Sequence, residues 1–240
     1  NVLSVIEEIQ QALESELQAA LNELAEAIEQ GNELKKNTNL TPEQSQTLTH
    51  MLTESESVDR SNLNNVQIAY EILLNTIQEI ETVIHQDLTA ALEDLANAKN
   101  KASLLISNND LTNEQSDLLN TVLAEADIVN YDSIIAVNEV QERLLNTMNT
   151  IEAELLTSVQ NELSETIERA QLLKSDRLLT AEQVQLIESE IASAEAVNKE
   201  SLEAIREAHQ SLLNVVTEIE TAKDLTIALT ELDEAIAQGN

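Results

Sequence analysis

Apolar residues recur along this chain at spacings of three and four, the period at which side chains share one face of an α-helix. The spacing occurs in three kinds of segment. Examples are Leu24, Ile28 and Leu34 in the first kind, Leu48, Leu52 and Val58 in the second, and Val66, Ala69, Leu73, Ile77 and Ile80 in the third. The 240 residues include two Gly, one Pro and no Phe or Trp, so few residues suit tight turns or aromatic-filled sheets. The sequence therefore predicts an all-α fold.

The helical pattern is itself repeated along the chain. Threonine followed three residues later by glutamine occurs at Thr41, Thr112 and Thr180, which are 71 residues apart (41 to 112) and 68 residues apart (112 to 180). A second landmark, Leu-Leu-Asn, recurs at the same two offsets, beginning at Leu73, Leu144 and Leu212. We predict repeats at residues 18–84, 85–155 and 156–223, preceded by the end of another repeat at 1–17 and followed by the start of a further one at 224–240.

Each repeat is expected to hold three helices. The threonine should cap the second helix, with the glutamine completing a capping box and Pro42 at a tolerated first position. The third helix should begin near Asn62, Ser133 and Ser201, which are again capping residues at equivalent places. The apolar positions on the three helices suffice for one small bundle core in each repeat.

The joints between repeats contain no Gly, Pro or turn cluster, and their apolar spacing stays helical. The third helix should therefore run unbroken into the first helix of the next repeat, for example from about Asn62 to about Ser107, roughly 67 Å at 1.5 Å per residue. The predicted architecture is a tandem array of three-helix bundles joined by continuous shared helices, a spectrin-like extended rod on the order of 120 Å or more in length.

Charge restricts the partners that this chain can have. It carries 45 acidic and 12 basic residues, a formal net charge of −33, which repels phosphate backbones and anionic membrane surfaces. The acidic residues are interleaved with apolar ones at helical spacing, as on a solvated helix face. Because of this charge we expect no nucleic-acid partner. No cysteine is present, so we expect no disulfide. No run of 18 apolar residues is present, so we expect no membrane insertion in this segment and no leader. Mutual repulsion favours a monomer.

Candidate chemistry is sparse. His50, His85 and His209 occupy different repeat positions, which argues against a shared metal site, and no nucleophile with a neighbouring base or phosphate-binding loop is present. The two glycines, Gly31 and Gly239, are both expected within first helices. We therefore predict no catalytic residue, no metal ligand, no cofactor and no enzyme activity. The only aromatic residues, Tyr70 and Tyr131, are expected at the edge of a bundle core.

The pattern resembles the FIVAR family, whose members are three-helix modules of Gram-positive surface proteins and some secreted glycosidases. The resemblance is carried by Leu24, Ile28, the stretch 41–44, Leu48, Leu52, Val58, Val66, Ala69, Leu73 and Ile77, with their two further copies. It implies a stalk of an adhesin, in a family sometimes implicated in binding matrix proteins such as fibronectin, or sugars. Leucines stand at Leu40, Leu111 and Leu179, where such modules often carry aromatic residues.

Three functional hypotheses follow. The first is a semi-rigid spacer in a longer extracellular, cell-wall-anchored adhesin, which projects a binding domain and contacts the neighbouring domains of the same protein. The second is a repeat module that itself binds a host matrix protein or a glycan, which would require exposed apolar or tyrosine residues at the same place in each repeat. The third is an intracellular spectrin-like scaffold with the same fold.

Overall fold

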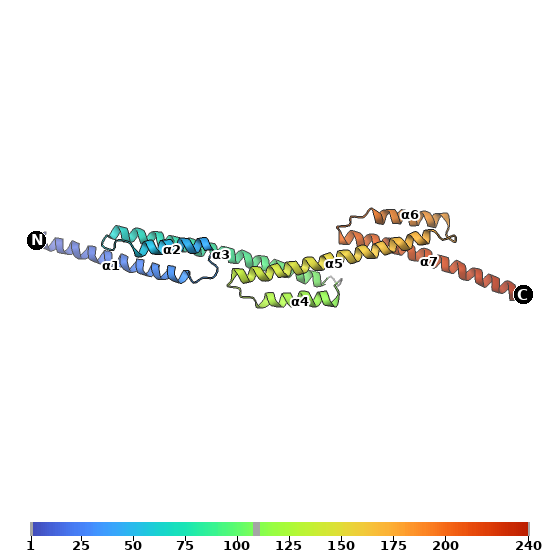
Figure 1. The fold of residues 1–240 in the computed structure, drawn as a ribbon, viewed down its shortest axis with the longest axis horizontal. Coiled ribbons are helices and arrows are strands. Elements are labelled where there is room, and N and C mark those ends of the chain that lie inside the picture. Colours follow the sequence, from blue (N-terminus) through green and yellow to red (C-terminus); the bar gives the residue numbers. More distant parts are fainter. Residues whose placement is uncertain (1, 108–110, 240) are drawn as a thin grey trace. The chain divides into compact units, whose positions relative to one another are not determined.

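A computed structural model describes residues 2–107 and 111–239 of the chain, and within them the protein forms α-helices without a strand (Figure 1). The helices are α1 (Val2–Leu34), α2 (Pro42–Glu56), α3 (Leu63–Ser107), α4 (Asn113–Ile128), α5 (Ile134–Lys174), α6 (Ala181–Glu195) and α7 (Leu202–Gly239). The predicted all-α class is confirmed. Parts of the predicted repeats that fall on residues 1, 108–110 and 240 lie outside the described residues.

The short helices α2, α4 and α6 begin where the threonines predict. The hydroxyls of Thr41, Thr112 and Thr180 each accept a hydrogen bond, 3.2 Å long, from the backbone N–H of the glutamine three residues later. That glutamine's side-chain oxygen accepts in return from the threonine N–H, at 2.8, 3.1 and 2.9 Å. Two of the donors that a helix start leaves unpaired are thus satisfied in each case.

The long helices begin at the predicted caps and cross the predicted joints. The side-chain oxygens of Asn62, Ser133 and Ser201 accept from the N–H three residues ahead, each at 3.2 Å. Helix α3 then continues for 45 residues and α5 for 41 without interruption. The prediction of an unbroken helix from about Asn62 to Ser107 is confirmed, and no Gly or Pro lies between them.

The chain divides into two compact units, and α3, α4 and α5 each have residues in both of them. The first unit comprises residues 1–104 and 119–145. Its largest buried cluster joins α1, α2 and α3 through Ala27, Leu34, Leu48, Leu52, Leu73, Ile77, Ile80 and Ile84. A smaller cluster at the other end of the same three helices contains Ala20, Leu24 and Val66. A further cluster joins α3, α4 and α5 through Ala91, Leu95, Ala126, Val137 and Val140.

The second unit comprises residues 105–118 and 146–240. Its core joins α5, α6 and α7 through one cluster of buried apolar residues: Val159, Leu163, Ala170, Leu173, Ile187, Ile191, Ala194, Ile205, Leu212, Val216 and Ile219. Each fully buried aliphatic side chain stabilises the fold by about 1.5–3 kcal/mol relative to exposure. Many of these residues occupy the same register as buried residues of the first unit, such as Leu163 with Leu24 and Leu95.

Candidate functional site

Two of the three histidines lie near glutamate side chains. His50 Nε2 lies 3.4 Å from Glu54 Oε1 on the exposed face of α2, and His209 Nδ1 lies 3.8 Å from Glu162 Oε2. His85 is exposed on α3. Among residues 2–107 and 111–239, no three His, Cys, Asp or Glu side chains converge in a way that could hold a metal ion.

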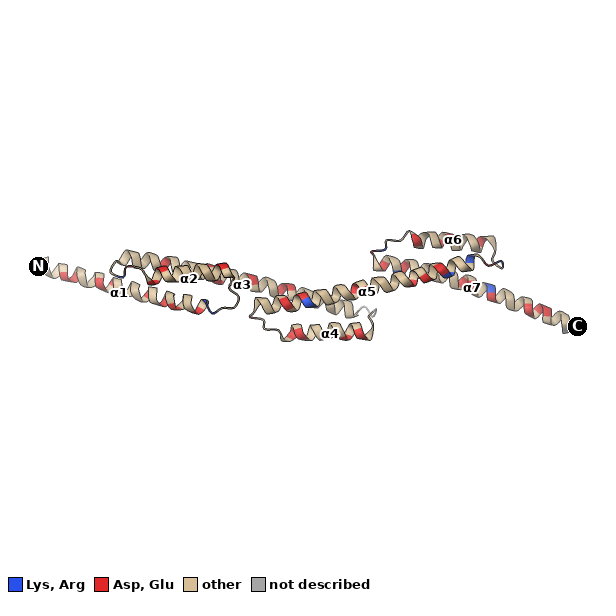
Figure 2. Cartoon of the chain, viewed as in Figure 1, with Lys and Arg blue, Asp and Glu red and all other residues tan. Residues whose placement is uncertain are grey.

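Acidic residues follow all the helices, whereas basic residues are few and scattered (Figure 2). The best-formed ion pairs join α5 and its following loop to α7. Arg169 Nε donates to Glu220 Oε1 at 2.9 Å, and Lys223 Nζ donates to Asp176 Oδ2 at 3.0 Å. The backbone N–H of Leu178 and the Lys223 ammonium hold the pKa of Asp176 below its ordinary value, and the Asp176 carboxylate raises the pKa of Lys223. These contacts tie α5 and its following loop to α7.

In the described part of the chain, no helix combines the length and the apolar composition needed to cross a membrane.

The two tyrosines behave differently from each other. Tyr70 is half-buried and packs against both clusters of α1, α2 and α3, as predicted for the edge of a core. Tyr131 lies in the loop between α4 and α5 with 41% of its surface exposed, so the same prediction is wrong for this residue. Its hydroxyl donates to the Ala126 carbonyl at 2.8 Å, which anchors the loop to the end of α4. Because its hydroxyl forms this hydrogen bond, a tyrosine can lie outside the core.

A junction between two loops of the first unit is built around Asn39, in the loop between α1 and α2. Its side-chain Nδ2 donates to the Asp132 carbonyl at 2.7 Å, and its Oδ1 accepts from the Ile134 N–H at 2.9 Å. Ile134 is the first residue of α5, where the helix leaves a backbone N–H without an intrahelical partner. Asn39 therefore caps a helix that begins 95 residues further along the chain.

The Ile134 side chain reinforces the same junction. It packs against the cluster of α1, α2 and α3 and also against the cluster of α3, α4 and α5. Helix α3 contributes to both clusters, so a shared helix, a shared side chain and a bidentate asparagine all connect neighbouring cores. Such a junction restricts bending between them.

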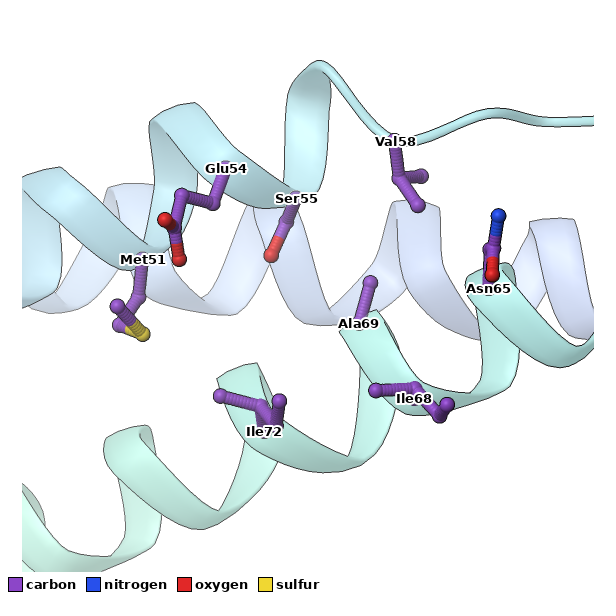
Figure 3. A pocket seen from close by; sticks show the side chains of 8 residues that line it. All are labelled: Met51, Glu54, Ser55, Val58, Asn65, Ile68, Ala69 and Ile72. Carbon is purple, nitrogen blue, oxygen red and sulfur yellow. The ribbon is translucent and has the colours of Figure 1, made fainter.

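A groove of 260 Å³ lies between α2 and α3 (Figure 3). Met51, Glu54 and Ser55 of α2 face Ile68, Ala69 and Ile72 of α3, while Val58 and Asn65 lie near the loop that joins the two helices. Ile68 and Ile72 are 46% and 50% exposed. The lining contains one carboxylate and no basic side chain.

The equivalent positions further along the chain are bridged by polar contacts. In the pair α4 and α5, Glu125 is equivalent to Glu54 and Arg143 is equivalent to Ile72. Glu125 Oε2 and Arg143 Nη1 lie 2.8 Å apart. Between α6 and α7, Ser211 stands at the position of Ile72, and its hydroxyl donates to Glu190 at 2.9 Å. The apolar lining between α2 and α3 is thus not repeated at these two equivalent places.

Sequence reasoning missed both the junction and the groove. A binding site predicted from the repeats would have exposed apolar side chains at the same place in every repeat, and the apolar lining of this groove is not repeated at the two equivalent places. The signal in the sequence was a difference between repeats, because Ile68 and Ile72 align with the charged residues Glu139 and Arg143. Asn39 carried no comparable signal, since asparagine is common in loops.

Comparisons with protein-family models, with curated proteins and with solved structures gave no match to this chain.

Proposed function

We propose that this chain is a stalk or spacer segment, a tandem array of three-helix bundles that projects a binding domain of a bacterial surface adhesin from the cell wall. The observation that carries the proposal is the continuity of α3 and α5, which pass through the predicted joints without a break. A continuous helix resists bending far better than a loop, so load passes from one core to the next through the helix backbone.

The packing supports a tandem arrangement. The same register positions are buried along the chain, for example Leu73, Leu144 and Leu212. In the first turns of α1, the residues at the positions of Leu73, Ile77 and Ile80 are Val2, Ile6 and Ile9, and they are 75%, 46% and 55% exposed. An exposed apolar stripe usually marks a contact surface, and a neighbouring repeat of the same protein would cover this one.

The extracellular, cell-wall-anchored location rests on the resemblance to FIVAR modules. The net charge of −33 agrees with a hydrated spacer whose copies repel each other and stay monomeric. The proposed partners are the neighbouring domains of the same long surface protein.

The alternative is that the repeats themselves bind a host matrix protein such as fibronectin, or a glycan. That reading requires an equivalent exposed apolar or aromatic site in each repeat. Ile68 and Ile72 are exposed near α2, but their counterparts are charged or polar, which favours the spacer. An intracellular spectrin-like scaffold would share the fold and differ in location, and a signal peptide with a wall-sorting tail in the parent protein would decide against it.

Small-angle scattering tests the spacer. We expect a maximum dimension on the order of 120 Å or more, from 1.5 Å rise per residue in the long helices. Asp87 is exposed within α3 at a predicted joint, and Asp87→Pro removes a helical hydrogen bond and kinks the helix at a cost of about 3 kcal/mol. The proline variant should shorten the particle and broaden its distance distribution, whereas the matched Asp87→Ala variant should scatter like the parent chain.

A compact globule for the unmodified chain would refute the spacer. For the binding alternative, the chain is immobilised and exposed to fibronectin; micromolar or tighter binding would reverse the order of the two proposals.

A further inference from the structure

We propose that the groove between α2 and α3 is a docking site for an amphipathic helix of a partner protein that carries leucine-like side chains flanked by lysine or arginine. The proposal concerns this one groove and goes beyond the spacer function, which does not depend on it.

The groove differs from its counterparts in a way that packing alone does not require. Its floor and walls consist of Met51, Ser55, Val58, Ala69 and the two exposed isoleucines. In place of the two isoleucines, α5 has Glu139 and Arg143. Helix α7 has Glu207 and Ser211 at the same positions, so polar residues occur at both equivalent places. Ile68 and Ile72 belong to neither buried cluster of α1, α2 and α3, and about half of each side chain is open to a partner.

The size and shape of the groove favour side chains of a helix over a free small molecule. Its 260 Å³ lies just below the roughly 300 Å³ at which small-molecule pockets begin. It lies open between two helices, with an apolar base and half-exposed aliphatic walls (Figure 3). A groove of this kind accepts the apolar residues that an amphipathic helix presents at positions i, i+3, i+4 and i+7.

Charge selects the flanking residues of the partner. Glu54 lines the groove, Asp59 follows directly after Val58 in the adjoining loop, and Glu79 lies seven residues beyond Ile72 on the same face of α3. Between residues 42 and 80 the only Lys or Arg is Arg60. A partner helix with lysine or arginine beside its apolar face gains both burial and attraction, since complementary potentials favour docking.

The same charge disfavours the other occupants. A second copy of this chain would bring its own net charge of −33 to the interface, and an anionic lipid surface or a nucleic acid would also be repelled. A basic amphipathic helix is the occupant that satisfies both the apolar lining and the acidic rim.

The test uses isothermal titration calorimetry of the intact chain with a helical model peptide of leucine and lysine, in which leucine follows the i, i+3, i+4, i+7 pattern. Two control peptides share its length: one replaces every lysine by glutamate, and one has the same composition in scrambled order. At 0.15 M salt the Debye length is about 8 Å, so attraction by distant carboxylates is strongly reduced. We expect micromolar binding of the patterned leucine–lysine peptide and at least tenfold weaker binding of both controls.

The key variant combines Ile68→Glu with Ile72→Arg, which copies the residues found between α4 and α5. It leaves the net charge of the chain unchanged and allows the new arginine to pair with Glu54, as Arg143 pairs with Glu125. A second variant, Ala69→Val, fills the groove from its base with the residue that Val140 supplies in the equivalent place, where it is 2% exposed. Each variant should weaken peptide binding at least tenfold while helicity and thermal midpoint stay close to those of the parent.

Backbone amide chemical shifts locate the binding, and the expected changes lie between residues 50 and 73. Equal affinity of the parent and both variants would overturn the proposal, because the peptide would then be held by diffuse charge. Equal binding of the glutamate peptide would also overturn it. So would a dimer in sedimentation velocity that the double substitution dissolves, since the occupant would then be a second copy. None of these results bears on the scattering test of the spacer.

Discussion

Gly31 shows how one position sets the spacing between neighbouring helices. It is buried in α1, and its equivalents Ala102 and Ala170 are completely buried. A methyl group added at Gly31 would lie 2.8 Å from Leu52 Cδ2 and 3.4 Å from Ile77 Cδ1. The missing side chain at Gly31 therefore allows α1 to approach Leu52 of α2 closely.

We expect Gly31→Ala to raise the free energy of unfolding by about 0.5–1 kcal/mol, the amount by which alanine exceeds glycine inside a helix. The close contact is with the end of the flexible Leu52 side chain, which must shift to admit the new methyl group. Urea denaturation monitored by circular dichroism measures the change. The reciprocal control, Ala102→Gly, should lose about 1 kcal/mol. A loss of stability in Gly31→Ala would show that Leu52 cannot move.

Asp176 gives the loop between α5 and α6 a dependence on pH. Hydrogen bonds from Leu178 N–H and Lys223 Nζ, each 3.0 Å long, lower its pKa from the ordinary value of 3.8. A carboxylate with a lowered folded-state pKa stabilises the fold above its unfolded-state pKa, and this stabilisation is lost as the pH falls through the folded-state value. The contribution is therefore complete at pH 7 and is lost progressively as the pH falls from 3.8 through the lower folded-state pKa.

We expect Asp176→Asn to lower the thermal midpoint at pH 7 and to have progressively less effect as the pH is lowered below 3.8. Scanning calorimetry of both proteins across this range gives the difference directly. Lys223→Met keeps an aliphatic side chain of similar length but removes the ammonium group, so it should reproduce part of the loss. An Asn variant whose deficit persists unchanged at the lowest pH would mean that shape, and not charge, accounts for the effect.

At the scale of elements, Asn39 tests whether neighbouring cores are coupled. Asn39→Ala removes the acceptor from the Ile134 N–H and the donor to the Asp132 carbonyl, at an expected cost of about 1 kcal/mol. Hydrogen exchange of the Ile134 amide should become faster, because its partner is replaced by water. Asn39→Asp keeps an acceptor for that amide while it removes the donor, so it should protect Ile134 better than alanine does. If exchange at Ile134 is the same in all three proteins, the contact does not restrain the start of α5.

The elements themselves were largely predictable from sequence. Capping boxes at Thr41, Thr112 and Thr180 and caps at Asn62, Ser133 and Ser201 are local features, and each begins a helix as predicted. The continuity of α3 followed from the absence of Gly and Pro, which is also local. The Asn39 junction joins residues 95 positions apart and depends on how two loops meet, so periodicity carried no signal for it.

The groove was hidden for a different reason. The repeat pattern consists of the residues that its copies share. Ile68 and Ile72 line the groove at positions where the other copies have charged or polar residues, so the pattern does not include them. The misplaced Tyr131 is a similar case, since its hydroxyl bond to Ala126 is specific to one loop.

At the scale of the whole molecule, net charge is the dominant property. A charge of −33 on 240 residues reflects carboxylates along every helix, and like charges destabilise a compact state. The opposing ion pairs are few in the described residues, and most of them are exposed, such as Lys174 with Glu188. Exposed pairs contribute about 0–1 kcal/mol each, so repulsion should outweigh attraction in the sum.

Added salt should therefore stabilise this protein. The Debye length falls from about 30 Å at 0.01 M to about 8 Å at 0.15 M and about 3 Å at 1 M, so most long-range repulsion is removed in the first step. We expect the thermal midpoint at pH 7 to rise with sodium chloride, steeply up to about 0.15 M and slowly above it. Calcium chloride at matched ionic strength serves as the control, because a larger rise would reveal cation binding to the carboxylates in addition to screening. A midpoint that falls with sodium chloride would mean that the ion pairs, such as Arg169 with Glu220, outweigh the repulsion between the 45 acidic side chains.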